Sequence, residues 1–337
     1  MKIIDLEDCK HLPKNNCSNL FNSFEWLHVI SKTYGLKFKA VSNENQGILL
    51  PFALIEDQDY KSIISIPFGD YILNDCSQDT QKEVLRFLIT TFPEYYIKVA
   101  IASKEQPVYE DFAVSQRGLL NQINIKKWKE STNWKEAYER NIRNALNYGL
   151  AVHISHDSQS ILDFYLLHEQ LRIHKFNKLP QPIQFFNHIH EIFLTNRKGF
   201  LIEAWSKDRI IASWLILIQG KTLYYKFGAS NPEDLKLRPN DLLFRSLMQY
   251  GSDNGYSTID LGFSGSGKSY EGLIRFKSKE GGDKIPIYKV EHFPPGFDET
   301  RQNEKTNYLN LIAEQAIGSH DLNVIRQASD HYYHLFS

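Results

Sequence analysis

The sequence has little cysteine, no excess of basic charge and no long apolar run. It contains three cysteines in 337 residues, namely Cys9, Cys17 and Cys76. No two of them have the C-x-x-C spacing and their number is odd, which argues against a disulfide framework or a zinc ribbon and suits a reducing cytoplasm. The longest apolar stretch, Ile210 to Ile218, is much shorter than the roughly 18 residues of a membrane helix. We therefore expect a cytoplasmic protein without a signal peptide or a membrane span.

The charge balance excludes one class of partner. Lys and Arg number 39 and Asp and Glu number 40, so the formal net charge is -1. Proteins that neutralise many phosphates of duplex DNA usually carry a basic excess, and we expect no duplex DNA as partner. His188 and His190 are two residues apart, so a helix would not place them on one face, and we expect no metal site there.

The hydrophobic pattern predicts a mixed α/β protein of about two domains. Strand-like and helix-like segments follow one another after residue 149 in the order β-α-α-β-β-β-α-β-α-β, which is typical of a mixed layer fold. The segment Lys126–Tyr148 has six basic side chains against three acidic ones and is the expected junction of the domains. Pro239-Asn240-Asp241 has the proline and the acidic residue of a helix start, and Gly255 suits the end of that helix.

A glycine-rich motif points to phosphate. Gly262 to Ser269 fits G-x-x-x-x-G-K-[ST], in which backbone N–H groups and a lysine hold phosphates, so Ser264, Lys268 and Ser269 are candidate binding residues. Only 68 residues follow Ser269, and none of them forms the apolar strand ending in Asp that would hold magnesium. A P-loop nucleotide enzyme is therefore an alternative to test. The loop is also compatible with anion binding without hydrolysis, or with a simple turn.

Several short motifs occur in a characteristic order, and each is weak alone. They are RNIRNA at Arg140–Ala145, LRIHK at Leu171–Lys175, LRPNDLL at Leu237–Leu243, GYSTIDLG at Gly255–Gly262 and IRFKSKEGG at Ile274–Gly282, preceded by FEW at Phe24–Trp26 and SIPFGDY at Ser65–Tyr71. This succession resembles the FemAB-like branch of the GNAT acyltransferase superfamily, and the resemblance extends to about Pro294.

The resemblance implies an α/β (α+β) fold of two GNAT-like domains, each a mixed central sheet flanked by helices, with a cleft between them. The expected divisions are residues 1–125, 126–298 and a helical tail, 299–337. The implied activity is N-acyl transfer from an activated donor, acyl-CoA or aminoacyl-tRNA, to an amine of a peptide, an amino sugar or a cell-surface polymer precursor. No tightly bound cofactor is implied. The sequence departs from acetyl-CoA-dependent relatives at Ala229–Lys236, which lacks the glycines of their phosphate-binding loop.

Three residues are candidate catalytic groups. Acyl transfer to an amine needs a proton acceptor and positive charge or hydrogen-bond donors at the developing oxyanion. Lys277 matches the lysine of the RFK motif and is the candidate positive group, although an exposed helix lysine is equally compatible with the pattern. Asp260, on an apolar strand, is a candidate base or a structural partner. Tyr225, on the central strand, is a candidate donor or a core residue.

Other residues are candidate substrate contacts. Arg140 and Arg143 share a helix face and suit a clamp for phosphate or carboxylate, or a solvated basic face. Arg172 and His174 end a helix, where positive charge also suits the helix dipole. The remaining candidates come from the motifs, namely Asn240, Arg275 and Phe276. A third hypothesis is a non-catalytic binding protein for glycan or peptide precursors.

Overall fold

The computed structural model describes residues 1–6, 19–43, 47–57, 60–65, 68–69, 77–130, 135–265, 271–279 and 281–336. The chain divides into two units. The first consists of residues 1–121, 263–270 and 284–301, and the second of residues 122–262, 271–283 and 302–337. The first division, near residue 121, lies close to the expected junction. Two later segments, residues 263–270 and 284–301, also belong to the first unit. No helix in the described ranges is long and apolar enough to cross a membrane.

The first unit is built on a mixed sheet with the strand order β1-β2-β3-β4-β5-β12-β6. Capping residues set the ends of helix α1. The Ser23 side chain accepts a hydrogen bond from the Trp26 N–H at the start of α1, and Gly35 ends that helix in the left-handed conformation. Its elements in chain order are β1 (Lys2–Asp5), α1 (Phe24–Tyr34), β2 (Phe38–Asn43), β3 (Gly47–Asp57), β4 (Tyr60–Ile64), α2 (Gln78–Thr91), β5 (Tyr96–Ala102), β6 (Ala113–Asn124) and β12 (Asp283–His292).

The second unit carries the sheet order β11-β10-β9-β8-β7. The predicted helix start at Pro239 and the predicted end at Gly255 are confirmed, because α7 begins at Pro239 and Gly255 has φ +70°. The elements are α3 (Ile125–Glu130), α4 (Lys135–Asn147), β7 (Leu150–Ser155), α5 (Ser158–Gln170), α6 (Ile183–Ile189), β8 (Gly199–Ser206), β9 (Arg209–Gln219), β10 (Thr222–Ser230), α7 (Pro239–Asp253), β11 (Thr258–Gly265), α8 (Glu271–Lys279), α9 (Glu299–Gly318) and α10 (Leu322–Tyr332).

The two units repeat one plan. In each, antiparallel strands are followed by a parallel pair, β4 with β5 in the first unit and β10 with β11 in the second. Both parallel ladders are three residues long, and a helix, α2 or α7, joins their strands. The last pairs are Ile64 with Lys98 and Tyr224 with Asp260, so Lys98 and Asp260 hold equivalent positions. This repeat agrees with the expected α/β fold of two similar domains.

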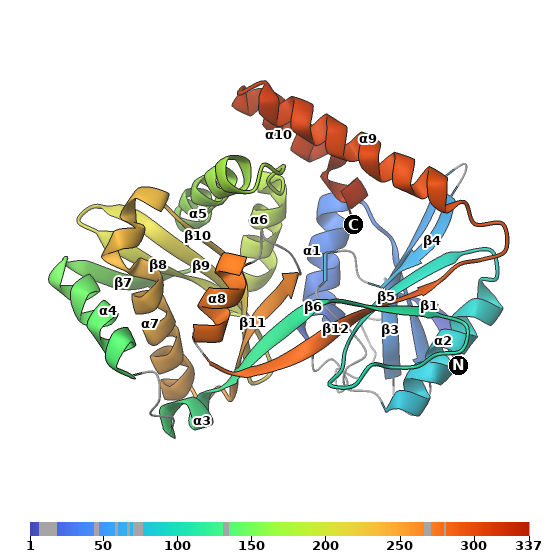
Figure 1. The fold of residues 1–337 in the computed structure, drawn as a ribbon, viewed down its shortest axis with the longest axis horizontal. Helices are drawn as coiled ribbons and strands as arrows, with labels where there is room; N and C mark the ends of the chain where they lie inside the picture. The colour runs from blue at the N-terminus through green and yellow to red at the C-terminus, as the bar shows by residue number, and fades with distance from the viewer. Residues whose placement is uncertain are drawn as a thin grey trace. The chain divides into compact units, whose positions relative to one another are not determined.

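The sheet of the second unit is covered on both faces. Helices α4 and α7 lie against one face and α5 and α6 against the other (Figure 1). Trp214 belongs to the core on the α7 face, whereas its neighbour Leu215 points the other way because side chains alternate along a strand. Alternation on β9 therefore tells which face every paired residue of β10 occupies.

Some elements were not expected from the sequence. The strands Phe38–Asn43 and Ala113–Asn124 and the helix Leu322–Tyr332 carry weak periodic signals. Within residues 299–337, α9 covers Glu299–Gly318 and α10 covers Leu322–Tyr332. The tail is fixed to α5 by Arg326, whose guanidinium binds both carboxylate oxygens of buried Glu169 at 2.7 and 2.8 Å.

Candidate functional site

The central strand β10 contains a bulge that turns two neighbouring aromatic side chains to opposite faces. Tyr225 pairs with Ile216 of β9, but Phe227 pairs with Leu215, so Lys226 is the extra residue. Tyr225 therefore faces α7 and lies with its ring edge-on to Trp214, at 4.8 Å between ring centroids. Phe227 faces α5 and α6. Bulges commonly re-aim side chains next to active sites.

The Tyr225 hydroxyl makes no hydrogen bond to the described protein. Within the described ranges it has no hydrogen-bond partner. It folds back over Gly228, where a Cβ atom would lie 2.0 Å from the tyrosine oxygen. Burial raises the pKa of Tyr225 well above its usual value, so the hydroxyl keeps its proton at neutral pH. The side chain is thus a protonated hydroxyl next to the bulge.

Trp214 brings three predicted site residues together. Its ring contacts Tyr225 on one side and Phe276 of α8, at 5.9 Å between centroids, on another. Its indole N–H donates a hydrogen bond of 3.1 Å to Oδ1 of Asn240, which also accepts one of 3.0 Å from the Ser230 hydroxyl. These bonds fix the Asn240 amide, and its Nδ2 has no protein partner among the residues that the structure describes.

A second cluster surrounds Gly262 at the place where β11 leaves the ladder. Asp260 Oδ1 accepts a 2.7 Å hydrogen bond from the Gly262 N–H, and Asp260 Oδ2 accepts one of 3.2 Å from Gln122 Nε2. The Lys277 ammonium donates a 2.9 Å hydrogen bond to the Gly262 carbonyl. Lys277 is only 2% exposed, so the alternative of an exposed helix lysine is wrong. Gly262 has φ +73°, a conformation that favours glycine.

The candidate catalytic residues do not all face the same way. In the ladder between β10 and β11, Asp260 pairs with Tyr224 and not with Tyr225. Asp260 therefore shares the face of Tyr224, opposite to that of Tyr225. Asp260 is 1% exposed and both of its oxygens accept protein hydrogen bonds. This geometry suits a residue that positions β11 better than a base in direct contact with substrate.

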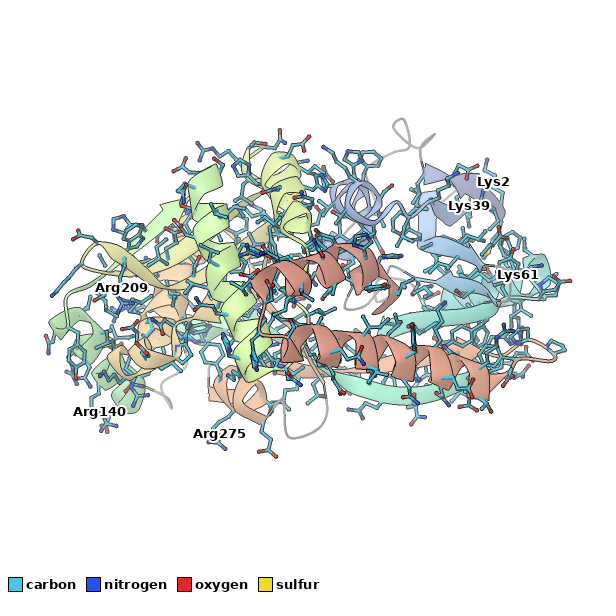
Figure 2. The ribbon with its side chains drawn as sticks, turned by 90° about the horizontal axis from the view of Figure 1, so that it is seen from above. Lys2, Lys39, Lys61, Arg140, Arg209 and Arg275 are labelled. Atoms are coloured by element: carbon cyan, nitrogen blue, oxygen red, sulfur yellow. The ribbon has the colours of Figure 1, made fainter. Side chains whose placement is uncertain are left out.

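The predicted basic contacts lie apart from these clusters. Arg140, Arg143 and His174 are exposed, and Figure 2 shows Arg140 and Arg275 projecting from the surface of α4 and α8. Arg172 donates two hydrogen bonds, of 3.1 and 2.9 Å, to the Leu179 carbonyl and so fixes the turn after its helix.

The glycine-rich motif begins on a strand. Gly262 to Gly265 are the last residues of β11, whereas Lys268 and Ser269 lie outside the described residues. Ser264 belongs to the first unit, is 1% exposed, and its Oγ has no hydrogen-bond partner among the residues described.

The segment between β10 and α7 is a folded turn. Pro232–Leu237 forms a 3-10 helix whose first turn is capped by the side chain of Asn231. Arg209 binds both carboxylate oxygens of Asp234, at 2.7 and 2.8 Å, and holds this turn to β9. The turn contains no glycine, so it offers no flexible cradle of N–H groups for a diphosphate.

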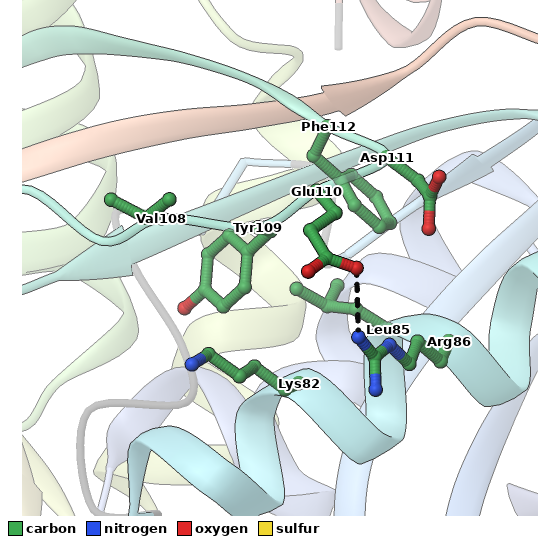
Figure 3. Close-up of a pocket in the computed structure, with 8 residues that line it drawn as sticks. All are labelled: Lys82, Leu85, Arg86, Val108, Tyr109, Glu110, Asp111 and Phe112. Atoms are coloured by element: carbon green, nitrogen blue, oxygen red, sulfur yellow. Dashed lines mark hydrogen bonds and ion pairs between the residues drawn. The ribbon is translucent and has the colours of Figure 1, made fainter.

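A small pocket of about 140 Å³ lies in the first unit between α2 and residues 108–112 (Figure 3). Arg86 and Glu110 form an ion pair of 3.1 Å across it, and the Tyr109 hydroxyl donates to the Gln81 side chain. None of the predicted site residues lines this pocket. In the described part of the chain, no three His, Cys, Asp or Glu side chains are grouped so that they could hold a metal ion.

Sequence reasoning missed three residues of the two clusters. Gln122 and Ser230 are ordinary polar residues on strands, and no local pattern singles them out. Trp214 lies inside the apolar run Ile210–Ile218, so it reads as a core residue. Only the register of β9 against β10 and the approach of α7 give it a place between Tyr225 and Asn240.

Comparison with known proteins supports a GNAT-like fold. Residues 133–277 match the family model described as an acetyltransferase (GNAT) domain. The fold is similar to the crystal structure of FemX, with a TM-score of 0.58, 16% identity, and coverage of 80% of this chain and 92% of FemX. It is also similar to L-PGS from Bacillus licheniformis (TM-score 0.56, 14% identity, 79% and 87% covered). No curated protein matches the sequence.

A third similar structure is a C-terminal domain assigned to a lysylphosphatidylglycerol synthetase of Agrobacterium fabrum. Its TM-score is 0.52 at 11% identity, and 75% of this chain and 83% of that one are covered. The domain match covers Tyr225, Asn240, Asp260 and Lys277, so both clusters lie inside the matched domain except for Gln122.

Proposed function

We propose that this chain moves an acyl or aminoacyl group from an activated donor to an amine of a peptide, an amino sugar or a cell-surface polymer precursor. Its domain match and its fold indicate a GNAT N-acyltransferase of the FemAB-like branch. The observation that carries the proposal is the free, protonated Tyr225 hydroxyl beside the bulge of β10, one residue beyond the end of the parallel ladder. The similar structures support aminoacyl transfer in general, since one of them is assigned to the synthesis of an aminoacylated lipid.

The reaction forms one bond and breaks another. The lone pair of the neutral acceptor amine attacks the acyl carbonyl carbon, and negative charge develops on the carbonyl oxygen. The C–N bond forms, the C–S or C–O bond to the leaving group breaks, and the proton that the amine gives up ends on the departing sulfur or oxygen. Tyr225 donates its hydroxyl hydrogen bond where this charge develops. Because burial disfavours its ionised form, the hydroxyl stays a donor through the working pH range.

The other side chains position the reacting groups. Trp214 holds the ring of Tyr225 and orients the amide of Asn240, whose Nδ2 is a second donor for the substrate. Asp260 and Lys277 fix the N–H and the carbonyl of Gly262 and so set the direction in which β11 leaves the ladder. Arg140, Arg143, Arg172, His174 and Arg275 are not needed for this arrangement.

The turn before α7 bears on the nature of the donor. GNAT acetyltransferases use an acyl-CoA as a substrate, and such a donor has a diphosphate to be bound. The Arg209–Asp234 ion pair and the Asn231 cap fix this turn, and the turn contains no glycine that would let its backbone adapt to a diphosphate. We therefore favour a donor that is held mainly by contacts elsewhere, such as an aminoacyl ester of tRNA, over acetyl-CoA.

The test is turnover with matched tyrosine variants. Purified protein is assayed with acetyl-CoA, longer acyl-CoAs and aminoacyl-tRNA against peptide and amino-sugar amines. Tyr225→Phe is expected to lower kcat by about a hundredfold with little change in KM, as loss of one oxyanion donor does. Tyr224→Phe, the neighbouring residue that faces the other way, is the control and should retain activity.

Three results of these assays would contradict the proposed function. Equal loss in both variants would show that the hydroxyl of Tyr225 has no special role. Binding of donor and acceptor without turnover would support the binding-protein hypothesis instead. Magnesium-dependent nucleotide hydrolysis that Lys268→Ala abolishes would restore the P-loop interpretation.

A further inference from the structure

The strand β7 has an unprotected edge. It pairs with β8 and is the last strand in the order β11-β10-β9-β8-β7, and no backbone hydrogen bond joins its other side to a described residue. Its six residues, Leu150–Ser155, include no lysine, arginine, carboxylate or proline, and its register against β8 contains no bulge. Proteins usually protect an exposed edge with one of these features, so β7 is open to pairing with a further strand.

The edge strand of the first unit shows the usual protection. The strand β1 begins the strand order of that unit and carries Lys2 and Asp5 at its two ends. The Asp5 carboxylate binds the Lys39 ammonium of β2 at 2.7 Å. Acidic and basic side chains therefore occupy one edge strand of this chain, whereas β7 has neither a carboxylate nor a lysine or arginine.

Exposed apolar side chains lie at both ends of β7. Ile154 alternates with Leu150 and Val152, which belong to the core on the α7 face, yet Ile154 is 43% exposed. Leu146 and Tyr148, which come just before the strand, are exposed as well, and Leu146 belongs to α4, which covers the same face (Figure 1). Antiparallel pairing sets the end of one strand beside the start of its partner. A second, antiparallel copy of β7 would therefore bring the two apolar ends together.

The charges at the two ends of β7 are complementary in the same sense. The last two turns of α4, before the strand, carry Arg140 and Arg143 and no acidic residue. Both arginines are exposed, and neither has an ion pair within the described part of the chain. Asp157 is exposed just after the strand, at the start of α5. In an antiparallel pair of copies the acidic end of each strand lies beside the basic end of the other, and the opposite charges attract.

We propose that two copies of this chain pair antiparallel through β7 about a two-fold axis, with Val152 opposite the second copy's Val152. Leu150 is then opposite Ile154, and the small Ala151 is opposite His153. A register centred on His153 would instead place two imidazole rings directly opposite each other. The interface is the same patch on both copies, as a two-fold axis requires.

A second copy suits this edge better than an unrelated extended peptide. Either partner would satisfy the free backbone groups of β7. Only the second copy also brings its own α4, and with it a cover for Ile154 and for the exposed side chains of Leu146 and Tyr148. The inference does not depend on the acyl-transfer activity.

Sedimentation velocity of the full chain tests self-association across roughly a hundredfold range of concentration. Ile154→Lys is expected to weaken the dimer about a hundredfold, because the two-fold axis places the change at two contacts that each contribute about tenfold. Leu166→Lys is the matched control. Leu166 is 41% exposed, but it lies on α5, which covers the opposite face of the sheet. This variant should dimerise as the unmodified chain does.

A cysteine at the centre of the pair gives a second test that does not rely on Ile154→Lys being folded. Val152→Cys should form a disulfide between copies on mild oxidation, because directly opposed residues have Cα atoms about 4.5–5.5 Å apart. Leu166→Cys is the control and should not form one. Peptide mapping separates this disulfide from any made by the three native cysteines.

Several results would overturn the proposal. They are a chain that stays monomeric at every concentration, equal weakening by Ile154→Lys and Leu166→Lys, and a dimer that Ile154→Lys leaves intact and that therefore uses another surface. A monomer that binds an alternating Thr-Val hexapeptide, and loses it in Ile154→Lys, would make the partner a peptide. Sedimentation involves no turnover, so a failure of the acyltransferase assay leaves this test intact.

Discussion

Asp260 and Lys277 bind opposite sides of one glycine. The Asp260 carboxylate accepts the Gly262 N–H at 2.7 Å, and the Lys277 ammonium donates to the Gly262 carbonyl at 2.9 Å. Both side chains are buried, and Gly262 has a positive φ. Two side chains of opposite charge, one from β11 and one from α8, thus hold the backbone of Gly262. Gly262 lies beyond the last residue pair of the ladder between β10 and β11.

Removal of the Lys277 ammonium should destabilise the protein. Lys277→Met keeps the length of the side chain but leaves the Gly262 carbonyl without this donor, which costs about 1–3 kcal/mol for a buried group. Arg275→Met on the same helix removes an exposed charge and should change stability by less than about 0.5 kcal/mol. Urea unfolding of both variants measures the two changes in stability. Equal changes would show that the hydrogen bond from Lys277 to the Gly262 carbonyl does not stabilise the fold.

Substitution of Gly228 should act through Tyr225. In Gly228→Ala the new methyl group would lie 2.0 Å from the Tyr225 oxygen, so the hydroxyl must move. We expect kcat to fall about as far as in Tyr225→Phe. The double variant should be no worse than either single one, because both changes remove the same donor. Additive losses in steady-state assays would show that Gly228 matters for another reason.

The sequence predicted the parts of the site that local chemistry encodes. Pro239 and Gly255 punctuate α7 as expected, and the RFK motif led to Lys277. It did not predict that Tyr225 and Asp260 face opposite sides of the sheet, since this depends on the bulge at Lys226 and on the register between β10 and β11. Neither feature has a local signature.

The basic candidates show the same limit. Arg140 and Arg143 do share a helix, but whether a helix face meets a substrate or solvent depends on packing that periodicity does not encode. Arg172 was expected at a helix end and is there, yet its partner is the Leu179 carbonyl seven residues later.

Acid should destabilise the second unit through His168. Burial lowers the pKa of His168 to about 3, and its Nε2 donates to Gln181 Oε1 at 2.7 Å. The unfolded chain takes up a proton near pH 6.5, whereas the folded one does not until about pH 3. The free energy of unfolding should therefore fall as pH drops through this range, by up to roughly 1.4 kcal/mol per pH unit from this residue.

The matched variants for this prediction are His168→Phe and His174→Phe. The first places a ring among Phe164, Phe186 and Phe227 and should flatten the dependence of stability on pH between 6.5 and 3. The second changes an exposed histidine and should leave the slope as it is. Urea unfolding at a series of pH values gives both slopes, and an unchanged slope in His168→Phe would refute the assignment.

The tail helix α10 should come loose when its ion pair with α5 is broken. Glu169 is buried, and in Arg326→Met its carboxylate keeps only the 2.8 Å hydrogen bond from the Tyr165 hydroxyl. Loss of one partner of a buried pair costs about 3 kcal/mol, at the low end of the usual range because Arg326 itself is 41% exposed. Urea unfolding and the rate of proteolysis within residues 319–336 measure this loss.

Arg245→Met is the control for the tail prediction. Its ion pair with Glu139, at 3.3 Å, lies on the surface with half-exposed partners and should contribute less than about 1 kcal/mol. The double variant Glu169→Gln with Arg326→Met should recover part of the stability, because no unpaired charge is then buried. If instead Arg326→Met and Arg245→Met are equally mild, water reaches Glu169 and the pair does not hold the tail in place.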